Sequence, residues 1–65
     1  MDLVTCRADR VQPGDMIDWH GRTALIEDML YDERTGDVTL TLDKGDGGRL
    51  TDYRFPGPAT LAVWQ

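Results

Sequence analysis

The sequence predicts an all-β fold of about five short antiparallel strands. Five segments have the length and the β-branched, aromatic or leucine content of strands, and residues that favour turns separate them. The clearest segment, Val38 to Leu42, alternates valine or leucine with threonine, which is typical of a strand with one buried face. Sixty-five residues form one domain, 1–65, without a linker or an internal repeat.

The first predicted strand, Met16 to Trp19, lies between two turns. Pro13-Gly14 suits the centre of a type II turn, because proline presets its own φ and glycine accepts a positive φ. His20-Gly21 is expected to reverse the chain after the strand. Residues 1–10 are expected to form an N-terminal extension or an edge strand.

The second predicted strand, Thr23 to Tyr31, does not alternate throughout. Its apolar residues change face between Ile26 and Met29, so a β-bulge near Glu27-Asp28 would bring them to one side. The stretch Glu27 to Arg34 could also be written as a helix. It lacks a capping residue and lies between two strand patterns, which favours the strand.

The last two predicted strands are Arg49 to Phe55 and Thr60 to Trp64. Tyr53 and Phe55 share one face of the former, which we expect to point inward, while the charged residues between them stay in water. A proline-rich corner, Pro56-Gly57-Pro58, separates the two strands and is expected to hold a short 3₁₀ turn.

Charge and composition narrow the classes of function. Twelve acidic against seven basic residues give a net charge of −5, which opposes contact with nucleic-acid phosphates. No apolar run reaches the roughly 20 residues of a membrane helix, and no signal-peptide pattern opens the chain. We therefore expect a cytoplasmic protein with a reduced Cys6. Its bias toward arginine and aspartate is common in GC-rich genomes, which suggests an actinobacterial or phage origin and, for a phage protein, the host cytoplasm.

Five short strands with tight turns describe an SH3-like small barrel, a bent sheet that closes on itself to limit exposed edges. The chain contains Val11-x-Pro13-Gly14-Asp15-x-Ile17, then Gly21 and Thr35-Gly36-Asp37-Val38. With these residues, roughly Val11 to Phe55 resembles the KOW-type N-terminal domain of elongation factor P and related SH3-like modules, and the resemblance implies the SH3-like fold. The loop between the second and third strands, which carries a basic residue in elongation factor P, is acidic here apart from Arg34.

The candidate partner-binding residues are two tryptophans and two arginines. Trp19 and Trp64 each end a strand, where a side chain lies at the rim of a barrel or plugs it. A rim tryptophan beside Arg22 or Arg54 is the composition that protein-binding patches favour.

No catalytic residue, metal ligand or cofactor site is predicted. Cys6 and His20 could be imagined as a nucleophile and its base, but His20 stands in a turn and Cys6 in an N-terminal segment. The loop Asp43 to Gly48 alternates carboxylates and glycines, yet its spacing does not match a calcium-binding EF-hand loop. A non-enzymatic protein is therefore expected.

The function predicted from the sequence is a small protein-interaction module. It would bind a protein partner, or a second copy of itself, through rim aromatic residues or an exposed strand edge. One alternative is a nucleic-acid-binding or ribosome-associated KOW-like module, and another is an acidic mimic of nucleic acid. The KOW-like alternative would use Arg22, Arg49, Arg54, Trp19 and Tyr53.

Overall fold

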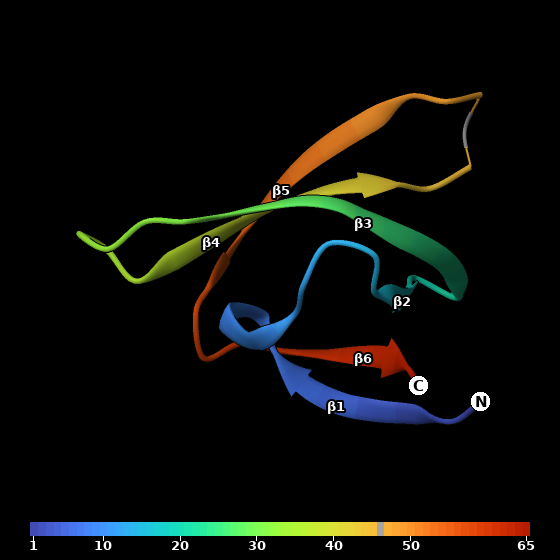
Figure 1. Ribbon diagram of the computed structural model, residues 1–65, viewed down its shortest axis with the longest axis horizontal. Helices are drawn as coiled ribbons and strands as arrows, with labels where there is room; N and C mark the ends of the chain where they lie inside the picture. Colours follow the sequence, from blue (N-terminus) through green and yellow to red (C-terminus); the bar gives the residue numbers. More distant parts are fainter. Residues whose placement is uncertain (46) are drawn as a thin grey trace.

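A computed structural model, which describes residues 1–45 and 47–65, shows a single antiparallel sheet of six strands (Figure 1). The predicted all-β class is confirmed, with six strands where about five were expected. The sheet bends but does not close into the expected barrel, because its edge strands β1 and β5 do not pair, and its strand order is β1-β6-β2-β3-β4-β5. The strands are β1 (Leu3–Arg7), β2 (Met16–Trp19), β3 (Arg22–Tyr31), β4 (Asp37–Asp43), β5 (Leu50–Pro56) and β6 (Thr60–Trp64).

The segment between β1 and β2 holds a 3₁₀ turn, η1 (Ala8–Arg10), and then the predicted Pro-Gly turn. Gly14 has a φ of 96°, and the Asp15 amide donates to the carbonyl of Gln12 at 3.0 Å, as a type II turn requires. This turn docks on β3 through two backbone hydrogen bonds, from Gly14 to Ile26 (2.8 Å) and from Ile26 to Asp15 (2.9 Å).

β3 contains the predicted bulge and no helix. Its pairing with β4 shifts between Ile26 and Asp28, the position at which the alternation of the sequence changes. The shift brings Met29 opposite the buried Leu40, so both ends of β3 face the same interior. The helix that could be written for Glu27 to Arg34 does not form, because this part of the chain pairs with β4.

The fully buried core is aliphatic. Leu40 and its two alternating neighbours in β4 are completely buried, as the sequence predicts, and threonines occupy the positions between them. The buried hydrophobic residues of the described chain are Ala8, Val11, Ile17, Ala24, Ile26, Val38, Leu40, Leu42 and Val63.

Tyr53 and Phe55 face the interior as the sequence predicts, and three of the five aromatic residues pack against this core. Trp19, Tyr53 and Phe55 pack against the core but stay only partly buried. These rings contact one another between β2 and β5.

The corner between β5 and β6 is a β-turn in which the Ala59 amide donates to the carbonyl of Pro56 at 3.0 Å. This bond joins residues three apart, as in the short 3₁₀ turn expected here, whereas the 3₁₀ helix of the described residues lies at Ala8–Arg10. Gly57 is buried at this corner, between Gly36 and Asp9. Its amide donates to the Gly36 carbonyl (3.0 Å) and its own carbonyl accepts from the Asp9 amide (3.1 Å).

Candidate partner-binding site

Trp19 and Arg22 face each other across the tight turn that joins β2 to β3. The turn residues His20 and Gly21 both have positive φ values, 52° and 79°, which is the geometry of a type I′ hairpin turn. A two-residue turn keeps Trp19 and Arg22 in direct register, so the hairpin end presents an indole and a guanidinium together.

Aromatic rings surround Trp19. The Tyr53 ring lies 4.6 Å from the indole in a tilted arrangement, and the Phe55 ring lies 5.7 Å away at nearly a right angle. The imidazole of His20 contacts the indole edge-on at 4.6 Å. Such tilted and edge-to-face pairs stabilise aromatic clusters beyond the area they bury. Trp19 therefore connects the β2–β3 hairpin to β5.

Two cationic side chains stand beside these rings. The ammonium of Lys44, just after β4, donates to the Tyr53 hydroxyl at 3.0 Å and lies 5.5 Å from the centre of the ring. The Arg22 guanidinium donates to the Lys44 carbonyl at 3.5 Å. These contacts tie the end of β4 to the β2–β3 hairpin.

The side chains line a cavity of about 260 Å³ that opens between the hairpin end and β5. Trp19 and Tyr53 give it aromatic walls, Arg22 and Lys44 give it positive charge, and His20 borders it. Among the described residues that line it, none carries a carboxylate. The arrangement suits an apolar group next to an anionic one, since the rings accept the former and the cations attract the latter.

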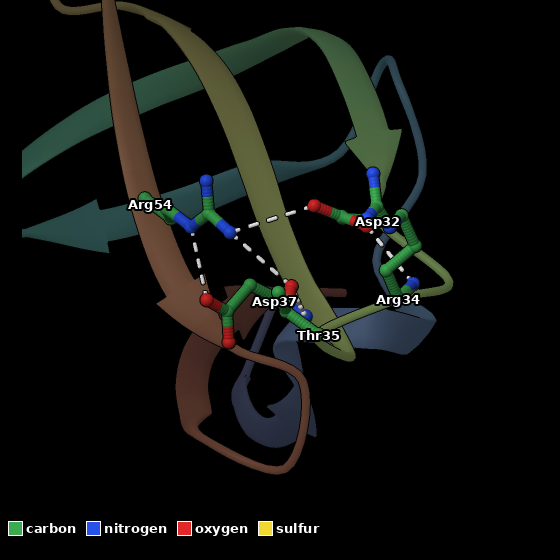
Figure 2. A network of polar contacts seen from close by, with 5 residues as sticks. All are labelled: Asp32, Arg34, Thr35, Asp37 and Arg54. Atoms are coloured by element: carbon green, nitrogen blue, oxygen red, sulfur yellow. Dashed lines mark hydrogen bonds and ion pairs between the residues drawn. The ribbon is translucent and has the colours of Figure 1, made fainter.

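Arg54 lies elsewhere, on the water-facing side of β5 (Figure 2). Its Nε donates to Asp37 at 2.9 Å, and its Nη2 lies 3.6 Å from an Asp32 oxygen and donates to the Thr35 hydroxyl at 3.2 Å. These contacts hold the β3–β4 loop against β5. Arg54 thus lies apart from the pair Trp19 and Arg22.

Trp64 is also separate from the cavity. In β6 it pairs with Leu3 on one side and Met16 on the other, and the neighbouring Val63 points into the core. Alternation therefore places the Trp64 ring on the outer face of the sheet. Its Nε1 is buried without a hydrogen-bond partner among the described residues.

The sequence predicted Trp19 and Arg22 as partner-binding residues, but it did not predict that Lys44 lies beside them. Lys44 reaches the cavity because Leu25 pairs with Asp43, which brings the end of β4 beside the start of β3. As a binding residue Tyr53 appeared only in the nucleic-acid alternative, and its inward direction was predicted from the alternation of its strand.

The other residues considered from the sequence are dispersed. Cys6 is a free, partly buried thiol in β1, opposite Leu61, whereas His20 lies in the β2–β3 turn. The Asp43 to Gly48 loop includes Asp46, which lies outside the described residues, and one Asp43 oxygen accepts from the Gly45 amide at 2.9 Å. No helix in the described part of the chain is long and apolar enough to cross a membrane. No known family model and no curated protein matches the chain.

Proposed function

We propose that the protein is a non-enzymatic, SH3-like interaction module of the cytoplasm whose cavity binds a segment of a partner protein. The observation that carries the proposal is the meeting of Trp19, Tyr53, Arg22 and Lys44 around one opening. Tryptophan, tyrosine and arginine are the residues in which the binding energy of protein interfaces concentrates.

The lining also defines the class of peptide. A chain of net charge −5 repels acidic partners over most of its surface, yet its cavity is bordered by cations. A peptide that carries a carboxylate beside an apolar side chain would meet the rings and the cations at the same time. A cavity of about 260 Å³ holds one or two side chains rather than a long segment.

One observation favours nucleic-acid binding as a second candidate. Three of the residues assigned to that role, Trp19, Tyr53 and Arg22, line the same cavity, where a base could stack. The remaining two, Arg49 and Arg54, do not line it, and the net charge opposes the phosphate backbone. We therefore rank this candidate second.

The acidic-mimic alternative has less support. Asp32 and Asp37, two of the carboxylates near the β3–β4 loop, contact Arg54. A mimic of a phosphate row needs carboxylates that present their charge to a partner, and these two are partly neutralised.

The test is binding of labelled short peptides, followed by fluorescence anisotropy. Three peptides of equal length would present an apolar residue beside aspartate, asparagine or lysine, and mixed-sequence DNA and RNA would be titrated in parallel across a salt series. We expect binding in the order aspartate, asparagine, lysine. Tight nucleic-acid binding that weakens steeply with salt would instead establish the second candidate.

Matched variants assign the binding to the cavity. Arg22→Gln should weaken the aspartate peptide about tenfold while leaving the asparagine peptide nearly unchanged, because only the former uses the charge. Arg34→Gln, at an exposed position in the β3–β4 loop, is the control and should bind both peptides like the parent protein. Equal binding of all three peptides, or equal effects of the two substitutions, would contradict the proposal.

A further inference from the structure

β1 forms one edge of the sheet. It pairs with β6 along its whole length, and no described strand lies on its other side (Figure 1). An edge strand offers unpaired amide and carbonyl groups to any strand that approaches in the right register. The chemistry of this edge depends on which residues direct those groups outward.

The hydrogen bonds between β1 and β6, and between their flanking residues, show which backbone groups of β1 face the free edge. Asp2 exchanges two bonds with Gln65, at 2.7 and 2.9 Å, and the Ala8 amide donates to the Ala59 carbonyl at 2.7 Å. In an antiparallel pair the residues that bond the partner strand alternate with those that do not. The backbone groups of Leu3, Thr5 and Arg7 therefore point away from β6, toward the free edge.

The two edges of the sheet differ in how they are protected. β5, the other edge, carries Asp52 and Arg54 and ends in Pro56, all of which discourage pairing with another strand. β1 has no proline and one charged residue, Arg7, at its end. Leu3 and Val4 are exposed in it by 44% and 38%. β1 thus lacks the protection that β5 has.

We propose that two copies of this chain pair through β1, antiparallel, to form one continuous sheet. Leu3, Thr5 and Arg7, whose backbone groups face the free edge, are arranged symmetrically about Thr5. A twofold axis through Thr5 therefore pairs Thr5 with Thr5 of the second copy, and Leu3 with Arg7 of the second copy, using every free amide and carbonyl of the strand. No other symmetric register uses all three residues.

Side chains and charge are compatible with this pairing. In this register the aliphatic part of Arg7 covers the exposed Leu3 of the other copy. Its guanidinium stays with Asp9 through hydrogen bonds of 3.0 and 2.8 Å. These bonds, followed by the charge of Asp9, raise the pKa of Arg7. β1 holds no carboxylate, so its three paired residues place no acidic group opposite another in a protein of net charge −5.

The experiment introduces a charged residue at Thr5, which lies on the proposed twofold axis. Thr5→Lys and Thr5→Glu each place two like charges opposite one another in the dimer, whereas an equimolar mixture of the two variants places opposite charges there. Thr60→Lys and Thr60→Glu are the matched controls, since Thr60 is an exposed threonine one strand further in. Sedimentation velocity over a concentration series measures association, and circular dichroism verifies that each variant is folded.

We expect the unmodified chain to dimerise with rising concentration, and more strongly with added salt, which screens the repulsion between the acidic copies. Each Thr5 variant alone should associate at least tenfold more weakly, the mixture should recover the dimer, and the Thr60 variants should behave like the unmodified chain. A monomer at every concentration, unaffected Thr5 variants, or a mixture that stays monomeric would overturn the proposal. Arg22→Gln should dimerise normally, which separates this surface from the cavity.

Discussion

Different kinds of contact hold the elements together at the two ends of the bent sheet. At one end, Gly57 joins the β5–β6 corner to the β3–β4 loop and to η1 through backbone hydrogen bonds. At the other end, Trp19 and Lys44 reach across to Tyr53 with their side chains. Backbone contacts connect the elements at the first end, whereas side chains at the second end line a cavity of about 260 Å³.

We expect this difference to separate the residues that determine stability from those that bind a partner. Backbone groups at the Gly57 end are satisfied within the chain and present little chemistry to a partner. The rings and cations at the Trp19 end remain partly exposed. We therefore expect substitutions at the Gly57 end to act on folding and substitutions at the Trp19 end to act mainly on binding.

The largest loss of stability is expected for a substitution of Leu40, which lies between the two ends. Leu40 is completely buried and pairs with Met29 and Tyr53, so Leu40→Ala leaves a cavity and should cost about 2 to 5 kcal/mol in the free energy of unfolding. A domain this small has a total free energy of unfolding of about 3 to 5 kcal/mol, so the variant should unfold largely at both ends of the sheet. Urea titration measures the loss. Thr39→Ala, on the opposite face, should be mild, and the reverse ranking would refute the assigned faces of β4.

The next effect belongs to the Gly57 end. A Cβ on Gly57 would lie 2.5 Å from the Gly36 carbonyl oxygen, which belongs to the backbone and cannot rotate away. Gly57→Ala should destabilise the fold by about 1 to 3 kcal/mol in thermal or urea unfolding, as overpacking does. Pro58→Ala, at the exposed neighbouring position, is the control. An unfolding midpoint of Gly57→Ala equal to that of the control would show that this end is not closed by the backbone.

At the Trp19 end the effect on stability should be smaller. Tyr53→Phe keeps the ring but removes the hydroxyl to which Lys44 donates at 3.0 Å. The loss of one such hydrogen bond costs about 0.5 to 1.5 kcal/mol, and the Trp19 indole should become more mobile. Urea unfolding measures the loss of stability, and tryptophan fluorescence anisotropy measures the mobility of the indole. A loss as large as that of Gly57→Ala would remove the distinction between the ends.

The smallest effect is expected for Arg54→Ala. Its side chain is 55% exposed and its ion pairs with Asp32 and Asp37 lie in water, where such pairs contribute about 0.2 to 1 kcal/mol. The difference from the parent protein should shrink as salt rises, because exposed charges are screened. Unfolding titrations at low and high salt measure it, and a loss that does not depend on salt would assign the effect to packing instead.

Local features of the fold were predictable because neighbouring residues decide them. The alternation of Val38, Leu40 and Leu42 specifies which face of β4 is buried. The Pro13-Gly14 turn depends on the φ preferences of two residues, and the bulge in β3 follows from a break in its alternation. Each of these was correct from the sequence alone.

The tertiary structure decided what depends on contacts between distant residues. The order of the strands, the two free edges and the approach of Lys44 to Arg22 follow from pairings that join residues far apart in the chain, and no local preference encodes them. For the same reason the sequence placed Arg54 beside the rim tryptophans, whereas the fold turned it toward Asp37. Local propensity thus determined the strands and turns of this protein, and long-range pairing determined which side chains share a site.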